Sequence, residues 1–418
     1  MRILLTGSTG FVGRHVGQAL RERGHEVLGC ARGALHHCDF STDHRPEDWL
    51  PRLAGVDVVI NAAGIIREQR RQRFEAVHVQ APAALFEACE QAGVKRVIQI
   101  SALGADPFSR GGYPGSRGRA DARLMGRPLD WLILRPSIVH GRGGVSSAFF
   151  QALASVPLVP LVGDGRQRLQ PIHVDDLVRA IVQAVERGEP RQRVVDCVGP
   201  DPVTLAEMLA LWRSWLGLGG WRPVSVAPAL ARVGAGVAGS LRIAPVSAEM
   251  VTMLQQGNAA PVEPFVRAFG WQPRGVAEAL SAHPSTEADR WHAKLYFLRP
   301  VLRFALAFVW IWTAVASAFL HPTAASYALL GSMGLAGMPA TLVLYGLALV
   351  DGLLGIALLL GWRVREVAWI QVALMTGYTL VAGLLLPGLW TDPFGPLSKN
   401  LPLIVATLIL IAMEAPRR

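Results

Sequence analysis

Short apolar runs alternate with helical patterns along residues 1 to about 200 of this 418-residue chain. The runs predict buried strands at 3–5, 25–30, 95–101, 130–134 and 194–198, a strand with its turn over 57–64, and a further strand ending at Asp39-Phe40. Helical spacing is expected to about 23 after the first strand, over 74–92 and 113–125, and from the segment 171–177 onward. This rhythm predicts the α/β class, with a Rossmann-type doubly wound parallel sheet and helices on both faces.

A mixed region follows from about 201 to 290, and we expect a small substrate subdomain and linker there. Thr204 is placed to cap a helix over 205–216. The small apolar residues of 230–241 suit either packing on a substrate cleft or contact with a membrane surface. A polar stretch at 281–292 is expected to be the linker. The predicted domains are therefore 1–200, 201–290 and 291–418.

The last part of the chain is almost continuously apolar, with long stretches at 304–320, 340–360, 367–386 and 401–413. A helix needs about 20 residues to cross a hydrocarbon core, so we expect an all-α bundle of four transmembrane helices. Basic residues gather on one side of these stretches: Lys294, Arg299, Arg303, Arg363, Arg365, Arg417 and Arg418. The positive-inside rule predicts an inner-membrane, multi-pass protein with its N-terminal domain and both termini in the cytoplasm.

Asp351 falls near the middle of the second stretch, where a carboxylate is costly. It suits a proton site, a contact to a quinone headgroup, or a hydrogen bond that fixes helix packing, and the sequence leaves these open. The net charge is +10, but Lys and Arg form no compact block, so we expect no nucleic-acid partner. The four cysteines form no C-x-x-C pair, so we expect free thiols and no metal site.

The first strand leads into a glycine-rich turn and then a helix. The motif is Thr6-Gly-Ser-Thr-Gly-Phe-Val-Gly13, in which Gly7 suits a tight turn and Gly10 offers no side chain to block a diphosphate. Gly13 lets the helix pack close to the strand, and the free N–H groups of the first helical turn then face the anion. We expect Thr6, Gly7, Thr9, Gly10, Phe11, Val12 and Gly13 to bind a dinucleotide.

Further candidate cofactor-binding residues follow the later strands. Arg32 stands where many NAD-binding folds carry an acid, and a guanidinium fits a 2′-phosphate, which favours NADP(H) while leaving NAD(H) open. Asp39 is expected to lie near the adenine. The small residues after Asn61, which are Ala62, Ala63 and Gly64, let a nicotinamide ribose approach the backbone. Pro136 and Ile138 complete this set.

These motifs resemble the short-chain dehydrogenase/reductase superfamily, in its extended or atypical branch. The resemblance covers about 1–200 and rests on the glycine motif, Asn61 to Gly64, Tyr113-x-x-x-Arg117, Arg135 to Gly141 and His173 to Asp176. Within that branch the chain is similar to the NADPH-binding accessory subunits of respiratory complex I and their bacterial relatives. The last part resembles the DoxX-like four-helix family, on the segment from Asp392 to Asn400.

The resemblance implies a Tyr as general acid/base, a Lys four residues later, and a Ser that orients the substrate. Tyr113 matches the Tyr, Arg117 replaces the Lys, and Ser101 is the serine nearest the third position, beside Ala102. Arg keeps the positive charge of Lys, but its planar fork makes different contacts. His78 stands where relatives often have Asn.

Two functions are predicted from these features. The first is a membrane-anchored NAD(P)H-dependent oxidoreductase or isomerase, acting on a carbonyl or hydroxyl substrate such as a quinone, isoprenoid or other lipid. The second is a non-catalytic NADP(H)-binding module that assembles with a respiratory or other membrane complex. The Tyr113 and Arg117 pair favours the first, whereas the replaced Lys and Ala102 favour the second. A sugar-nucleotide epimerase fits the fold but not the Tyr/Arg pair.

Overall fold

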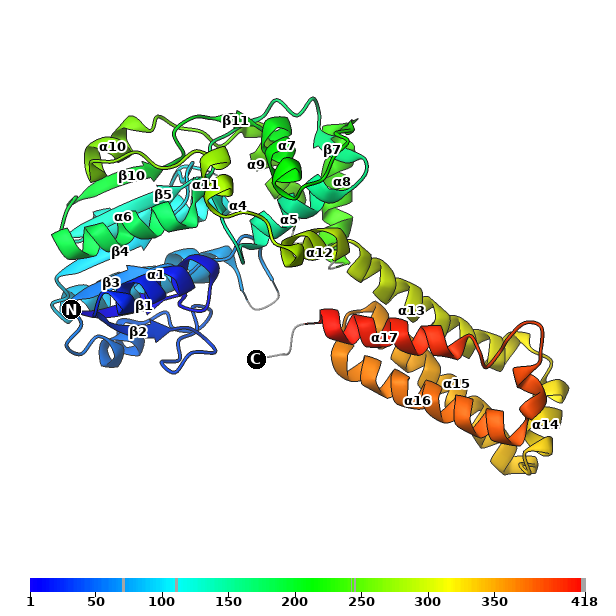
Figure 1. Cartoon of the computed structure of the whole chain (residues 1–418). Helices are drawn as coiled ribbons and strands as arrows, with labels where there is room; N and C mark the ends of the chain where they lie inside the picture. The colour runs from blue at the N-terminus through cyan, green and yellow to red at the C-terminus, as the bar shows by residue number, and fades with distance from the viewer. Residues whose placement is uncertain (70–71, 110–111, 242, 244–245, 415–418) are drawn as a thin grey trace. The chain divides into compact units, whose positions relative to one another are not determined.

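The computed structural model describes residues 1–69, 72–109, 112–241, 243 and 246–414 (Figure 1). The chain forms two compact units. The N-terminal unit comprises Met1–Gly239 and Ala244–Lys294, and the C-terminal unit comprises Ser240–Ile243 and Leu295–Arg418.

A six-stranded, wholly parallel sheet forms the centre of the N-terminal unit. Its order is β2-β1-β3-β4-β5-β10, so the chain turns back across β1 to place β3 on the other side. That reversal is the switch point at which ligands bind in open parallel sheets. The strands are β1 (Arg2–Thr6), β2 (Glu26–Cys30), β3 (Val58–Asn61), β4 (Arg96–Ile100), β5 (Trp131–Pro136) and β10 (Arg193–Cys197).

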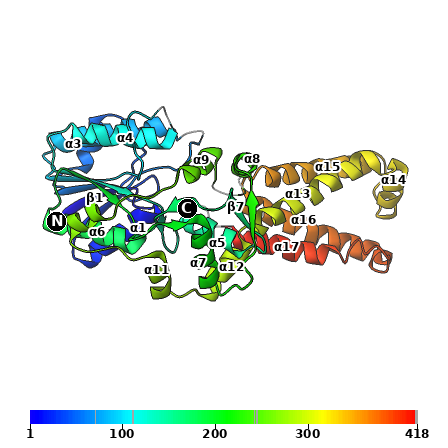
Figure 2. The same cartoon turned by 90° about the horizontal axis from the view of Figure 1, so that it is seen from above.

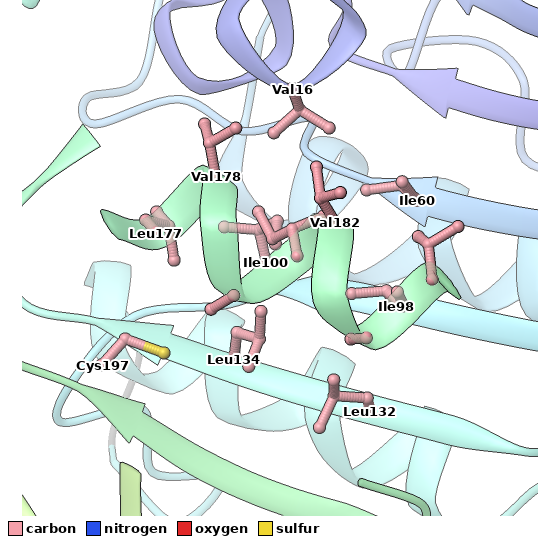
Figure 3. Close-up of a cluster of buried hydrophobic side chains, with 14 of the residues drawn as sticks. Val16, Ile60, Ile98, Ile100, Leu132, Leu134, Leu177, Val178, Val182 and Cys197 are labelled. Atoms are coloured by element: carbon pink, nitrogen blue, oxygen red, sulfur yellow. The ribbon is translucent and has the colours of Figure 1, made fainter. Parts of the chain in front are cut away.

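Helices cover both faces of this sheet (Figure 2). On one face lie α1 (Phe11–Glu22) and α6 (Val174–Arg187), and on the other lie α3 (Ala81–Gln91) and α4 (Gly112–Met125). Figure 3 shows how Val178 and Val182 of α6 pack among Val16 of α1 and the apolar side chains of β3, β4 and β5. The burial of both sheet faces explains why these strands are apolar without alternation.

A second group of short elements stands beside the sheet and has its own apolar core. Its two-stranded pairs are β6 (Val139–His140) with β9 (Ile172–His173), β7 (Val159–Val162) with β12 (Pro223–Val226), and β8 (Arg168–Leu169) with β11 (Val203–Thr204). Its helices are α5 (Val145–Ser155), α7 (Leu205–Trp215), α8 (Pro228–Ser240), α9 (Ala248–Gln256), α11 (Val276–Ala282) and α12 (Glu287–Leu295). Helix α10 (Glu263–Phe269) instead packs Phe265 and Phe269 on the core of the parallel sheet. The predicted cap is confirmed, because Thr204 and Glu207 form a reciprocal capping box at the start of α7.

Three local expectations are corrected. No strand forms at Asp39-Phe40, because the Asp39 carboxylate accepts the Ser41 N–H and closes a turn instead. The helix expected over 74–92 begins as a π-helical segment, Glu75–Gln80, before α3. The polar stretch expected as a linker contains most of α12. A short turn of helix, α2 (Pro46–Trp49), and a 3₁₀ turn (Leu50–Arg52) complete the connection from β2 to β3.

The C-terminal unit is helical, as expected. It consists of α13 (Leu298–Val315) with a π-helical extension (Ala316–Leu320), α14 (Thr323–Ser332), α15 (Gly337–Leu359), α16 (Val364–Leu385), a 3₁₀ turn (Pro387–Trp390) and α17 (Asn400–Met413). Within the described residues, three helices are long and apolar enough to cross a membrane: Leu298–Leu320, Gly337–Leu359 and Val364–Leu385. The fourth apolar helix, α17, is shorter, so the expectation of four spans stays a prediction.

Candidate functional site

The glycine turn lies at the switch point, between β1 and the loop that follows β3. Gly7 has a φ of +65°, and a Cβ there would lie 2.6 Å from the carbonyl oxygen of Ala62. A Cβ on Gly13 would collide with the carbonyl oxygen of Gly7. Around Gly10, by contrast, a Cβ would approach only the Gly7 carbonyl oxygen, at 3.1 Å. The turn is therefore closed against protein on one side and open beside Gly10.

The open side is suited to an anion. Gly10 is the N-cap of α1 and has no side chain, so no side-chain cap satisfies the first N–H groups of the helix. Thr9 and Gly10 are exposed, while Phe11 and Val12 are half-buried in the first turn. Bare N–H groups at a positive helix end are the donors that bind a diphosphate. The residues of this turn thus fit a dinucleotide.

Thr6 and Asn61 belong to a buried polar row that joins the ends of three neighbouring strands. The Asn61 amide oxygen accepts the Thr6 hydroxyl and the Ala63 N–H, and its Nδ2 donates to Gln99 Oε1 at 2.7 Å. All three side chains of the row are fully buried. Thr6 and Asn61 therefore hold the loops around a ligand in shape rather than present a side chain to it.

Arg117 reaches from α4 to the loop between β3 and the π-helical segment. Its Nη1 donates to the carbonyl oxygens of Ile100 at 3.2 Å and Ala63 at 3.4 Å. A Cβ on Gly64 would overlap Arg117 Nη2, so the glycine makes room for the guanidinium. The Arg117 side chain is buried, and its Nε has no hydrogen-bond partner among the described residues.

The Tyr113 ring lies over this cation and against two other rings. The Arg117 guanidinium carbon is 5.4 Å from the Tyr113 ring centroid, and His78 and Phe74 meet the ring edge-on at 5.6 and 6.0 Å. The ring is half-buried, and its hydroxyl makes no hydrogen bond within the described chain. The tyrosine is thus held by its ring while its hydroxyl is free for a ligand.

His78 fixes the tyrosine from behind. Its Nε2 accepts the Ile65 N–H at 3.1 Å, so Nδ1 carries the proton and donates to Ser116 Oγ at 2.9 Å. Ser116 in turn donates to the Tyr113 carbonyl oxygen. Burial, and then the charge of Arg117, lower the pKa of His78 to about 2. The neutral imidazole therefore links the loop after β3 to the start of α4.

Ser101 is directed into the protein. Its hydroxyl donates to Asp121 Oδ2 at 2.9 Å, and the same oxygen accepts Arg135 Nε at 2.9 Å. Ser101 and Asp121 are both buried. Burial raises the pKa of Asp121 against the opposing effect of Arg135. The serine that the sequence suggested for orienting a substrate already has a strong internal acceptor.

The remaining predicted cofactor residues lie around the same edge. Arg32 follows β2, is exposed, and forms no ion pair in the described part of the chain. Asp39 is half-buried and caps its own turn. Pro136 ends β5, and Ile138 donates its N–H to Asn258 Oδ1 while its side chain packs on the core of the smaller elements. Ala62 and Ala63 line the loop against the glycine turn.

Asp121 and Glu249 are among the residues of this arrangement that were not selected from the sequence. Asp121 stands four residues after Arg117, a spacing that places both on one helix face, so helical periodicity could have found it. Glu249 accepts the Tyr113 N–H at 2.9 Å and comes from α9, so no local pattern points to it.

A second cluster of side chains could hold a metal by distance alone. The donor atoms of His173, Asp175 and His283 all lie within 4.8 Å of one another. However, His173 Nδ1 already accepts the Asp175 N–H as the N-cap of α6. Arg274 Nη2 also lies 3.5 Å from that nitrogen and 3.8 Å from Asp175. These contacts account for the cluster as an ion-pair network.

The fold and this site define a Rossmann-type, dinucleotide-binding α/β unit joined to a helical, membrane-integral unit. Sequence comparison finds a different matching family for each unit. Residues 3–108 and 122–196 match the NAD dependent epimerase/dehydratase family, and residues 307–408 match the DoxX-like family. The two units of the chain are thus similar to two different families. The first match omits 109–121, the segment that holds Tyr113 and Arg117.

Three known proteins show the range of relatives. NADH dehydrogenase [ubiquinone] 1 alpha subcomplex subunit 9 of Arabidopsis thaliana is 29% identical over 48% of this chain and 54% of its own length. Ceramide reductase of Caulobacter vibrioides is 30% identical over 43% and 59%. A human epimerase family protein, solved with NADPH, superposes with a TM-score of 0.53 at 20% identity, over 71% of this chain and 99% of that one. The present chain thus spans little more than half of the two relatives found by sequence.

Proposed function

We propose that the protein is a membrane-anchored NAD(P)H-dependent oxidoreductase or isomerase that acts on a carbonyl or hydroxyl group. One observation carries this proposal: the free Tyr113 hydroxyl belongs to a ring that lies over the Arg117 cation, and that cation bonds the loop beside the glycine turn. A proton donor and a dinucleotide cradle are thereby gathered at one sheet edge. The family match supports the NAD(P)-dependent class, and the substrate is not identified by it.

Each residue of the site has a distinct role in the proposed reaction. A bound nicotinamide would supply or accept a hydride at its C4 atom. In the reducing direction, Tyr113 donates its hydroxyl proton to the substrate oxygen as the carbonyl carbon gains the hydride, and then regains a proton from water. Arg117 attracts the negative charge that forms on the ring. His78 and Ser116 hold Tyr113 in place.

NADP(H) is the proposed cofactor, on the strength of Arg32. This guanidinium stands at the end of β2, exposed and without an ion pair among the described residues, as a 2′-phosphate site requires. We expect Arg32→Ala to weaken NADPH binding about tenfold or more while leaving NADH unchanged, since a charged hydrogen bond is worth about 1.5–3 kcal/mol. Fluorescence titration with both nucleotides measures this. Equal losses for the two would remove Arg32 from the 2′-phosphate site.

Two contacts of the same site favour a second, non-catalytic function. Ser101 is bound to Asp121, and Arg117 is buried on main-chain carbonyls rather than placed as a mobile ammonium. These features fit a module that binds NADP(H) and assembles with a membrane complex, as the name of the Arabidopsis relative suggests. Under either function we propose a location in the inner membrane, with the nucleotide-binding unit in the cytoplasm.

One experiment separates the two functions. The full chain, purified in mild detergent, is mixed with NADPH and a panel of carbonyls, quinones and lipid ketones, and absorbance is followed. For an enzyme, Tyr113→Phe should lower the rate by about 10²-fold or more, the usual contribution of a general acid. Tyr345→Phe, a matched change on an exposed tyrosine of α15, should leave it unchanged. Tight NADPH binding with no turnover on any substrate, and co-purification with a respiratory assembly, would favour the non-catalytic module.

A further inference from the structure

Helix α8 carries an apolar stripe that nothing in the described chain covers. Leu230, Val233 and Val237 are 67%, 65% and 52% exposed, and Leu241 continues the same spacing just beyond the helix. Steps of three, four and four residues place these side chains on one helical face. Ala235 is the one buried residue that the structure describes in α8. The helix thus contributes little to the apolar core, and its larger side chains face outward.

The charge of this segment suits a lipid surface. Helix α8 contains no acidic residue, and its one charged side chain, Arg232, is exposed. Arg222 is exposed shortly before the helix. Aliphatic side chains together with arginines favour the boundary between the acyl chains and anionic headgroups.

The chain itself ties the end of α8 to a candidate membrane span. Ser240, the last residue of α8, and Leu241 after it belong to the C-terminal unit. The carbonyl oxygen of Leu241 accepts Arg303 Nη2 at 2.9 Å, and Arg303 stands in the second turn of α13, the first candidate span. The stripe therefore continues directly into a segment that packs with membrane helices.

We propose that α8 lies in the headgroup region of the bilayer, with Leu230, Val233, Val237 and Leu241 facing the acyl chains. A lipid surface is the occupant because the exposed stripe, the absence of acidic residues from the helix, and the continuity with α13 all point to it. A protein partner would account for the exposed stripe, but not for the absence of acidic residues or for the continuity with α13.

This placement matters for the candidate site. At the end of α8, the Gly239 carbonyl oxygen accepts Arg67 Nη1 at 3.3 Å, two residues after Ile65, which bonds His78. From α9, Glu249 accepts the N–H of Tyr113. If the proposed enzymatic function holds, a lipid-borne substrate would meet Tyr113 beside this surface. The location of α8 in the bilayer does not depend on that function.

The test places a spin label on α8 in the full chain. Single variants Val233→Cys and Val237→Cys are labelled and reconstituted into nanodiscs of phosphatidylcholine with phosphatidylglycerol. The four native cysteines are buried, so unsubstituted protein gives the labelling background. Gln18→Cys, at an exposed position of α1, is the matched control in water. Collision with oxygen reports lipid, and collision with a water-soluble nickel chelate reports water.

We expect the labels at 233 and 237 to collide with oxygen and lose the nickel broadening that the label at 18 retains. Nickel broadening equal to that of the control would show α8 in water. Loss of both collisions would show α8 covered by protein. Either of these last two results overturns the proposal.

Discussion

The two units place the same kinds of side chain in opposite positions. In the N-terminal unit, Leu4, Ile60 and Phe86 are fully buried between sheet and helices. In the C-terminal unit, Phe308, Leu349 and Leu384 are among many large apolar side chains that are exposed along the long helices. Since exposed apolar surface on this scale is unfavourable in water, the comparison teaches that the two units fold against different solvents.

Buried polar side chains differ in the same way. In the N-terminal unit several of them lie at the carboxyl edge of the sheet and bond across elements, as in the row of Thr6, Asn61 and Gln99. In the C-terminal unit they are scattered through the helices. Asp351 accepts Tyr378 at a long 3.4 Å, while Gln371 is fully buried without a partner among the described residues. The first pattern joins neighbouring strands at one edge of the sheet, whereas the second forms no such row among the described residues.

The largest expected effect is on membrane insertion, and it is tested by changing one exposed leucine to arginine in each unit. Leu349, in the middle of α15, is 63% exposed, and Leu35, in the loop after β2, is 95% exposed. An arginine at the centre of a span costs roughly 2.5–3.5 kcal/mol, so Leu349→Arg should sharply reduce membrane insertion. Leu35→Arg should change stability by no more than about 0.5 kcal/mol. The yield of membrane-integrated protein measures both. Equal tolerance of the two arginines would show that water surrounds both units.

This contrast was largely visible in the sequence. Continuous apolar stretches and periodic short runs are strong signals, and they predicted the helical C-terminal unit and the parallel sheet. The strand predicted to end at Asp39-Phe40 was wrong, because the Asp39 side chain accepts the Ser41 N–H and closes a turn there. The apolar stretch predicted at 401–413 closely matches α17 (Asn400–Met413), but a helix of this length leaves the fourth span a prediction.

The next effect tests the glycine turn of the N-terminal unit. In Gly13→Ala the new Cβ meets the Gly7 carbonyl oxygen, and neither backbone can yield easily. Overpacking of this kind costs about 1–3 kcal/mol, so NADPH binding should weaken roughly 5- to 150-fold, or the unit should melt earlier. Gly219→Ala is the matched control, because a Cβ there meets nothing within 4 Å. NADPH titration and thermal melting that give the same values for both variants would contradict the close approach.

The candidate site was only partly predictable. The glycine turn, Tyr113 and Arg117 have fixed spacings, so the sequence could select them. The direction of a side chain has no such signal: Ser101 turns toward Asp121 because that carboxylate and Arg135 form a buried acceptor pair. Likewise, Asn61 supports neighbouring strands, and Glu249 reaches Tyr113 across 136 positions of sequence.

A smaller effect tests whether the histidine behind Tyr113 is neutral. Burial holds the pKa of His78 at about 2 in the folded protein, below its ordinary value of 6.5. The unfolded chain therefore takes up a proton below pH 6.5 that the folded chain refuses. The contribution of His78 to the free energy of unfolding should be constant above pH 6.5. Below pH 6.5 it should fall by up to about 1.4 kcal/mol per pH unit. Denaturation of the detergent-solubilised protein at several pH values measures the slope.

The variant His78→Gln should show a flatter slope between pH 6.5 and 5, because it removes the group that charges on unfolding. His37→Gln, at an exposed histidine of the loop after β2, should keep the slope of the unsubstituted protein. A slope that His78→Gln does not change would mean that His78 is already charged in the folded state. The contacts from Ile65 and to Ser116 would then have to be assigned differently.

The smallest expected effect is a change in the stability of the helical unit. Here the sign of the change, rather than its size, is the test. Gln371 is fully buried in α16 with neither amide atom bonded in the described chain, so Gln371→Leu should be neutral or stabilise by up to about 1 kcal/mol. Thr379, on the same helix, accepts Asn400 Nδ2 at 2.8 Å, so Thr379→Val should destabilise by about 1 kcal/mol. Thermal melting in detergent compares the two. If Gln371→Leu proved the more damaging, the glutamine would have a partner or ligand in the bilayer, and the helical unit would contain a polar site comparable to the one at the sheet edge.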